Sequence, residues 1–128
     1  MKKLLLISTL LFSAMFSTPS YGEWTKVTKS VDGSTYYADF DRIRKHDGYV
    51  YVWEIGNFLK PLLGKYFSGK IYRQYDCKLF RSKMVSSSYH QEPMGYGPGV
   101  PGPEGVPDWE YPPPNSIHEK FIQRVCSQ

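Results

Sequence analysis

The fold class of this 128-residue chain is decided by residues 49–55, which read Tyr-Val-Tyr-Val-Trp-Glu-Ile. Side chains alternate between the two faces of a β-strand, so this stretch presents on one face Tyr49, Tyr51, Trp53 and Ile55 and on the other Val50, Val52 and Glu54. Both faces are mostly apolar, which is typical of a central strand that is covered on one side and at least partly on the other. We therefore expect the chain to fold around a sheet.

Shorter alternating runs on both sides of this stretch predict the rest of the sheet. They indicate strands over residues 24–28, 34–38, 67–77 and 79–88 and a short final strand over residues 108–111. Asp32-Gly33 and Asp47-Gly48 are typical of hairpin turns.

Three segments between these strands are expected to be irregular. Residues 39–45 are predicted as a short turn in which only Ile43 points inward, and residues 58–64 as a connecting loop because Pro61 interrupts them. Residues 92–107 contain five glycines and five prolines, which exclude a helix or a central strand. We expect an exposed loop there, either a polyproline II docking segment or a spacer.

A single helix is predicted at the C-terminal end. Ser116 is a good N-cap, and Glu119 three residues later completes a capping box. The helix presents one apolar stripe, made of Ile117, Phe121, Ile122 and Val125. The side chains of His118, Lys120 and Gln123 are expected to face outward. Because so short a helix is marginal alone, it needs a tether to the sheet.

Cys77 and Cys126 are the two cysteines of the chain. In an exported protein an even number of cysteines favours a disulfide over free thiols. A bridge would close a loop of about 50 residues and stabilise the fold by about 4 kcal/mol. It would also tether the helix. The expected fold class is thus α+β: a bent antiparallel sheet of about six strands with one C-terminal helix held to one face by a disulfide.

Residues 1–22 have the organisation of a signal peptide. Lys2 and Lys3 precede an apolar stretch over residues 4–16 and a small, polar tail over residues 17–22. We expect cleavage before Glu23 and a single domain over residues 23–128, with a buried N-terminal helix or an uncleaved anchor as the alternatives. The mature form then has no transmembrane segment, and without a cysteine near the cleavage point no lipid anchor is expected. The predicted location is the periplasm or the cell surface.

Charge and motifs give no support for catalysis. Without Lys2 and Lys3, the number of basic residues falls from 16 to 14, against 12 acidic residues. This excess of positive charge is too small to indicate binding to nucleic acid. The histidines, His46, His90 and His118, lack metal-ligand spacing, and no motif marks an activated nucleophile. We expect no enzyme, cofactor or metal site. Two carboxylate pairs are more typical of turns or solvated surface than of acid–base chemistry: Asp39 with Asp41 and Asp108 with Glu110.

Binding is the better supported class of function. Arg42, Arg44 and Lys45, followed by His46, are expected to form a compact basic turn that could bind a polyanion such as heparan sulfate, lipopolysaccharide or nucleic acid. More cations are spread over the predicted middle strands, namely Lys65, Lys70, Arg73, Lys78, Arg81 and Lys83. The alternative is an ordinary solvated sheet face. The eleven tyrosines suit a recognition surface but also reflect β-propensity.

The order and spacing of several short motifs resemble the surface-adhesin protein E family of bacterial envelope proteins. The matching residues run along nearly all of the mature chain: Trp24, Tyr36-Tyr37-Ala38-Asp39, Ile43, Lys45, Val52-Trp53, Ser68, Tyr75-Asp76-Cys77, Met94-Gly95, Trp109 and residues 116–126. The resemblance implies a six-stranded antiparallel sheet with a helix held to its concave side by a disulfide, and a homodimer as one possible state. It also implies adhesion to host extracellular-matrix and serum proteins such as laminin and vitronectin.

Two features depart from that family, namely the missing lipid-attachment cysteine and the segment over residues 92–107. No ligand-binding position can be carried across. We expect an exported, non-enzymatic binding protein of the bacterial envelope, with extracellular-matrix or other envelope proteins as partners. The rival functions are a periplasmic structural or assembly factor without a host ligand, and a small hydrolase or lectin-like enzyme.

Overall fold

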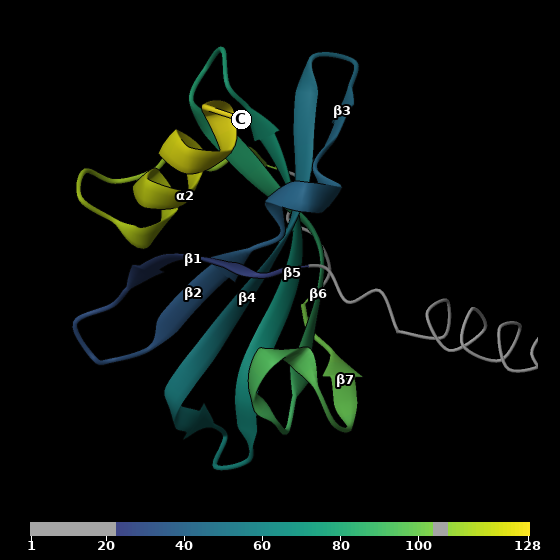
Figure 1. Ribbon diagram of the computed structural model, residues 1–128, viewed down its shortest axis with the longest axis vertical. Helices are drawn as coiled ribbons and strands as arrows, with labels where there is room; N and C mark the ends of the chain where they lie inside the picture. The colour runs from purple at the N-terminus through teal and green to yellow at the C-terminus, as the bar shows by residue number, and fades with distance from the viewer. Residues whose placement is uncertain (1–22, 104–107) are drawn as a thin grey trace, which may run out of the picture.

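The computed structural model describes residues 23–103 and 108–128, which form a twisted antiparallel sheet of seven strands and one C-terminal helix (Figure 1). The sheet order is β1-β2-β4-β5-β6-β7, and β3 pairs with the start of β4. The elements are β1 (Thr25–Lys29), β2 (Thr35–Ala38), the 3-10 turn η1 (Phe40–Arg42), β3 (Arg44–His46), β4 (Tyr49–Leu62), β5 (Tyr66–Asp76), β6 (Arg81–His90), the 3-10 turn η2 (Pro93–Gly95), β7 (Gly99–Pro101) and α2 (Ile117–Cys126).

The predicted fold class is confirmed, with seven strands in place of about six. β3 and β7 are additional strands, whereas residues 108–111 contribute only an isolated bridge between Glu110 and Ser82. Within the described part of the chain, no helix combines the length and the apolar character that crossing a membrane requires. The predicted signal peptide, residues 1–22, lies outside the described residues.

β4 is longer than predicted, and the expected connecting loop over residues 58–64 is wrong as far as Leu62. β2 pairs with β4 only up to Asn57. Beyond that point β4 has an unpaired edge, where the missing N–H of Pro61 is tolerated. The turn into β5 is made by Leu63 and Gly64, whose φ angles of 53° and 72° match the type I′ turn that favours tight hairpins.

The predicted turn over residues 39–45 is partly wrong as well. η1 occupies its first half, and Ile43 is half-buried against the core as expected. Arg44–His46, however, forms β3 and pairs with Tyr49–Tyr51 of β4. The hairpin turn predicted at Asp47-Gly48 is confirmed, since both residues have positive φ and connect β3 to β4.

The segment over residues 92–107 is not the plain loop that its composition predicts, although residues 104–107 lie outside the described part. It contains η2 and then β7, an exposed strand that pairs with β6 along one edge only. Ser68 fixes the start of the segment, because its hydroxyl donates to the carbonyl of Glu92 at 2.6 Å and accepts from the N–H of Gly95 at 2.9 Å. As predicted, the described part of the segment, residues 92–103, forms no central strand.

The helix begins at the predicted N-cap. Ser116 Oγ accepts from the N–H of Glu119 at 3.0 Å. The Glu119 carboxylate accepts from the N–H of Asn115 at 3.3 Å rather than from that of Ser116, so the reciprocal half of the capping box is displaced by one residue. Both contacts use donors that would otherwise lack partners at the helix start.

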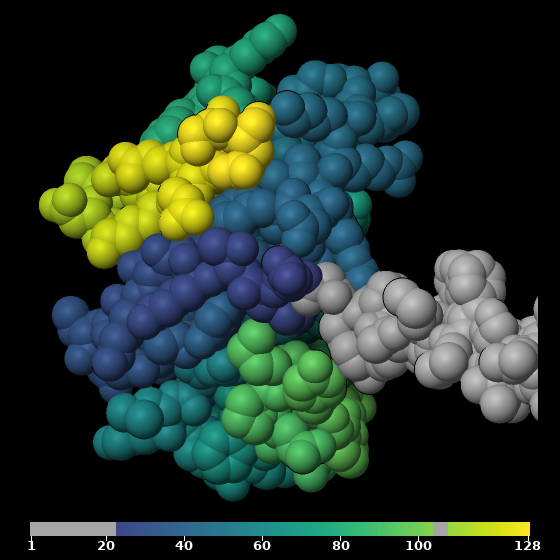
Figure 2. Space-filling view, viewed as in Figure 1, coloured from purple at the N-terminus to yellow at the C-terminus, as the bar shows by residue number. Residues whose placement is uncertain are grey.

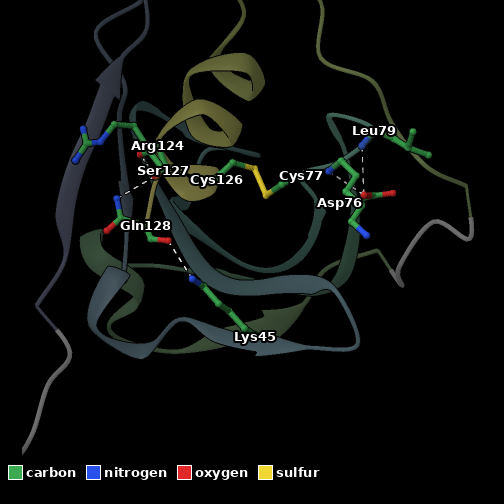
Figure 3. Close-up of a disulfide and its surroundings, with 9 residues drawn as sticks. Lys45, Asp76, Cys77, Leu79, Arg124, Cys126, Ser127 and Gln128 are labelled. Carbon is green, nitrogen blue, oxygen red and sulfur yellow. Dashed lines mark hydrogen bonds between the residues drawn. A yellow bond between two sulfur atoms is a disulfide. The ribbon is translucent and has the colours of Figure 1, made fainter.

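α2 covers one face of the sheet. Its buried residues Phe121, Ile122 and Val125 belong to one core cluster with residues of β2, β4 and β5, and the helix lies directly against β1 (Figure 2). A disulfide joins Cys77, just after β5, to Cys126 at the helix end, with the Cα atoms 5.6 Å apart (Figure 3). The predicted tether is therefore confirmed.

Candidate functional site

The two faces of the sheet differ in what covers them. α2 packs on the face that carries Val52 and Tyr75. The opposite face, here the open face, carries Tyr49, Tyr51 and Trp53 by alternation along β4. Among the described residues no helix packs on it, and only η2 approaches its far end, near Ile55. The open face is thus the face of the sheet that α2 does not cover.

Strand register arranges the open face in rows. Each row consists of residues that are paired across neighbouring strands. The first row contains Arg44, Tyr51, Gln74 and Lys83, the second Trp53 and Tyr72, and the third Ile55 and Lys70. Successive rows are about 6.6 Å apart, since each step covers two residues of about 3.3 Å. Residues from four strands thus contribute to one continuous surface.

Five rings form an aromatic patch on the open face: Tyr49, Tyr51, Trp53, Tyr72 and Trp109. Tyr72 lies between two of them, with its ring centroid 4.7 Å from that of Trp53 and 5.9 Å from that of Tyr51. Trp109, from the segment that returns along β6, lies 5.5 Å from Tyr49. All five are half-buried, so each ring packs on its neighbours while part of it meets solvent.

Cations border this aromatic patch. Lys70 Nζ lies 4.8 Å from the Trp53 ring centroid. At the other end, the Arg81 guanidinium and Lys83 Nζ lie 4.3 and 4.5 Å from the Trp109 ring. These distances are within the range of cation–π attraction. Arg81 also pairs with Asp76 at 2.9 Å, whereas Lys70 and Lys83 form no ion pair with any described residue.

The three cations predicted to form one polyanion site do not lie together. Arg42 pairs with Asp39 at 3.4 Å beside η1. Arg44 and Lys45 are neighbours in β3 and therefore point to opposite faces, Arg44 to the open face. Lys45 Nζ donates instead to the backbone carbonyl of Gln128 at 3.0 Å (Figure 3). Arg44 alone of the three joins the surface formed by the aromatic patch and its cations.

A polar cluster is buried on the covered face around Glu54, which is 5% exposed. Arg73 Nε donates to one carboxylate oxygen of Glu54 at 3.2 Å, and the Tyr75 hydroxyl donates to the other. Burial raises the pKa of Glu54, and the Arg73 charge opposes this rise. Burial and the nearby Glu54 charge raise the pKa of Tyr75, which keeps its proton. Since both oxygens of Glu54 have internal partners, this cluster holds strands β4 and β5 together.

His118 belongs to the same buried region, so the prediction that it faces outward is wrong. Its Nε2 lies 2.6 Å from Ser82 Oγ on β6, and its ring packs near Tyr75. Burial lowers the pKa of His118, and the positive charge of Arg73 lowers it further. The first turn of α2 therefore half-buries two neighbouring side chains, Ile117 at its stripe and His118 against β6.

A cavity of about 360 Å³ lies on the covered face between the sheet and α2. The cross-strand pair Gly56 and Gly69 forms part of its wall. A Cβ at Gly56 would approach the Tyr36 ring to 3.0 Å, and one at Gly69 the Phe58 ring to 3.2 Å. These glycines leave room for the rings. The cavity is mainly apolar, because aromatic and aliphatic side chains make up most of its lining.

One carboxylate of each predicted pair forms an ion pair with an arginine. Asp39 is 2% exposed and pairs with Arg42, and Glu110 pairs with Arg73 at 3.6 Å. In residues 23–103 and 108–128, no three metal-ligating side chains gather in a group that could hold an ion.

Sequence reasoning missed the aromatic patch and the Glu54–Arg73 pair. The alternation of side chains along β4 predicted that its three rings share one face. It does not predict how β4 pairs with β5, and this pairing places Tyr72 beside those rings. Trp109 is brought in by the bridge between Glu110 and Ser82, for which the sequence has no local signal. A glutamate on an otherwise apolar strand face was the one visible sign of a buried partner.

Comparisons with known proteins agree with this architecture. The family model for Surface-adhesin protein E matches residues 24–127. No curated protein matches the chain. Among solved structures, crystal form II of Haemophilus influenzae protein E is 18% identical with a TM-score of 0.69, covering 86% of this chain and 91% of that one. The selenomethionine form is 17% identical with a TM-score of 0.64, covering 86% and 90%. At these identities the structures show a shared fold.

Proposed function

Because the chain belongs to the surface-adhesin protein E family, we propose that it is an exported, non-enzymatic surface protein that attaches to extracellular-matrix proteins through its open face. The family supports a binding role at the cell surface. The Cys77–Cys126 disulfide supports export, since such bonds persist outside the reducing cytosol. The predicted signal peptide over residues 1–22 is consistent with this route.

The aromatic patch is the observation that carries the proposal. Five half-buried rings from β4, β5 and the segment after β7 form one surface without a covering helix. Tyrosine and tryptophan dominate the energetics of protein interfaces, because they bury a large amphipathic area with few rotatable bonds. These rings lie outside the core under α2, which has its own aromatic residues in Tyr75 and Phe121.

The proposal is tested by binding of the full, oxidised chain, recovered after export, to surfaces coated with purified matrix proteins. Tyr72→Ala, which removes the central ring of the aromatic patch, is expected to weaken binding by about 30-fold, the equivalent of about 2 kcal/mol. Phe67→Ala is the matched control, because Phe67 is an aromatic residue of β5 that is 37% exposed and points to the covered side. Equal binding by both variants and the parent would refute the assignment to this face.

Exposure at the cell surface separates this proposal from a periplasmic structural factor. An impermeant amine reagent should label the protein on intact cells that express it. Labelling only after the outer membrane is permeabilised would rule out a role in adhesion and favour the periplasmic alternative.

A further inference from the structure

We propose that the open face recognises a linear, sulfated glycan chain of the kind carried by matrix proteoglycans. This inference rests on the proposed adhesive function and names the chemical class of its ligand. The ligand must match three features of the surface: its cations, the distance between them, and rings whose faces are already partly occupied.

The first feature is an excess of positive charge. Four cations lie on or beside the rows of the open face: Arg44, Lys70, Arg81 and Lys83. They are placed there by the pairing of β3, β4, β5 and β6. Asp76 is the neighbouring carboxylate and is neutralised by Arg81 at 2.9 Å. Burial raises the pKa of Asp76, but hydrogen bonds from Arg81 and the backbone lower it overall, so this pair stays ionised. The other three cations form no ion pair with any residue that the structure describes. Such a face attracts an anion.

The second feature is the spacing of the cations. Lys70 and Gln74 are four residues apart in β5, about 13 Å along the strand at roughly 3.3 Å per residue. Lys83 is the direct neighbour of Gln74 on β6. The row of Trp53 and Tyr72 lies between the rows that hold these lysines. An isolated phosphate or sulfate is too small to touch both ends, whereas an extended polymer with repeated acidic groups can lie over the rings and reach both.

The third feature distinguishes a glycan from a nucleic acid. Single-stranded nucleic acids bind by stacking bases on free aromatic faces. Here the Trp53 ring is approached by Lys70, and the Trp109 ring by Arg81 and Lys83. The tyrosines pack on neighbouring rings, Tyr51 against Tyr72 at an interplanar angle of 25°. These contacts occupy part of the ring faces on which a base would stack. A sugar chain needs only a shallow apolar surface for its C–H groups and cations for its sulfates, which this arrangement offers.

The polar neighbours of the aromatic patch suit the same ligand. Gln74 lies in the row between Tyr51 and Lys83 and offers both a donor and an acceptor to sugar hydroxyls. Ser86 and Ser88 continue the rows of Tyr72 and Lys70 onto β6. The face therefore combines apolar, cationic and neutral polar groups in adjacent rows.

The test uses the full, oxidised chain and immobilised heparan sulfate. The double variant Lys70→Gln/Lys83→Gln should bind at least tenfold more weakly than the parent at physiological salt, and its binding should depend less on salt because fewer ion contacts remain. Lys60→Gln/Lys120→Gln is the matched control. It removes the same charge from two exposed lysines, one on the outer stretch of β4 and one on α2, and should bind within twofold of the parent.

A second arm separates this inference from the adhesive function itself. The same protein is applied to a proteoglycan coat before and after enzymatic removal of its heparan sulfate. Loss of binding after digestion, together with binding to the isolated chains, supports the inference. Undiminished binding to the digested coat overturns the inference and leaves the proposed function standing, whereas no binding to either coat overturns both. Equally tight binding of a single-stranded DNA of matched charge would show a general polyanion surface and overturn the glycan assignment.

Discussion

Replacing Arg73 by methionine should strongly destabilise the protein, because it removes the cationic partner of a buried carboxylate. Glu54 is 5% exposed, and its Oε1 lies 3.2 Å from Arg73 Nε. Methionine fills most of the vacated apolar volume, so the main change is electrostatic. Breaking a buried ion pair by removing one partner destabilises a protein by about 3–5 kcal/mol, a large part of a typical total stability of about 5–15 kcal/mol.

The dependence on pH identifies the cause of that loss. Burial already raises the pKa of Glu54, and Arg73 opposes the rise, so the Arg73→Met variant should raise it further. A folded-state pKa above the unfolded value means that folding favours the protonated carboxyl group. The destabilisation should therefore be largest at pH 8 and should shrink as the pH falls through the folded-state pKa of Glu54. The stability gap to the parent is expected to narrow at pH 5.

Urea unfolding followed by tryptophan fluorescence measures both quantities. The control is Glu54→Gln/Arg73→Met, which removes the buried charge together with its partner and leaves an amide near the Tyr75 hydroxyl. It should recover most of the loss and show little narrowing with pH. A gap below about 1 kcal/mol for Arg73→Met at pH 8, or a gap of equal size at pH 8 and pH 5, would refute the view of Glu54 as a buried charge that depends on Arg73.

Three further changes test the packing of α2. Cys126→Ser should lower the free energy of unfolding by about 4 kcal/mol, since the bridge closes a loop of about 50 residues; chemical reduction of the parent should reproduce this loss in urea unfolding, and an undiminished midpoint would contradict it. Phe121→Ala, at a residue 3% exposed, should cost about 3–5 kcal/mol by opening a cavity, and an unchanged thermal midpoint would mean that the helix stripe does not pack. Burial and Arg73 lower the pKa of His118, so the folded protein resists its protonation and loses stability as the pH falls below the unfolded value of about 6.5. His118→Gln should remove that loss, and parallel pH profiles of parent and variant would exclude it.

Local chemistry was sufficient for several elements. The alternation in residues 49–55 identified the central strand, and the Ser116 cap with its apolar stripe identified α2. Asp47-Gly48 identified a hairpin turn. Each of these signals acts over a few neighbouring residues, so it is written in the sequence itself. The cysteine pair could also be matched, because the chain offers only one pairing.

The tertiary structure decided what depends on register between distant strands. β4 can continue past Pro61 because β2 does not pair with it there and no N–H of residue 61 is needed. The residues predicted as one basic cluster separate, because Arg44 and Lys45 face opposite sides of β3. The aromatic patch unites residues 49 and 109 through strand pairing and a returning segment. Composition and periodicity indicate which side chains share a strand face. Which faces meet is set by hydrogen bonds between strands far apart in the chain, and the binding surface exists only at that level.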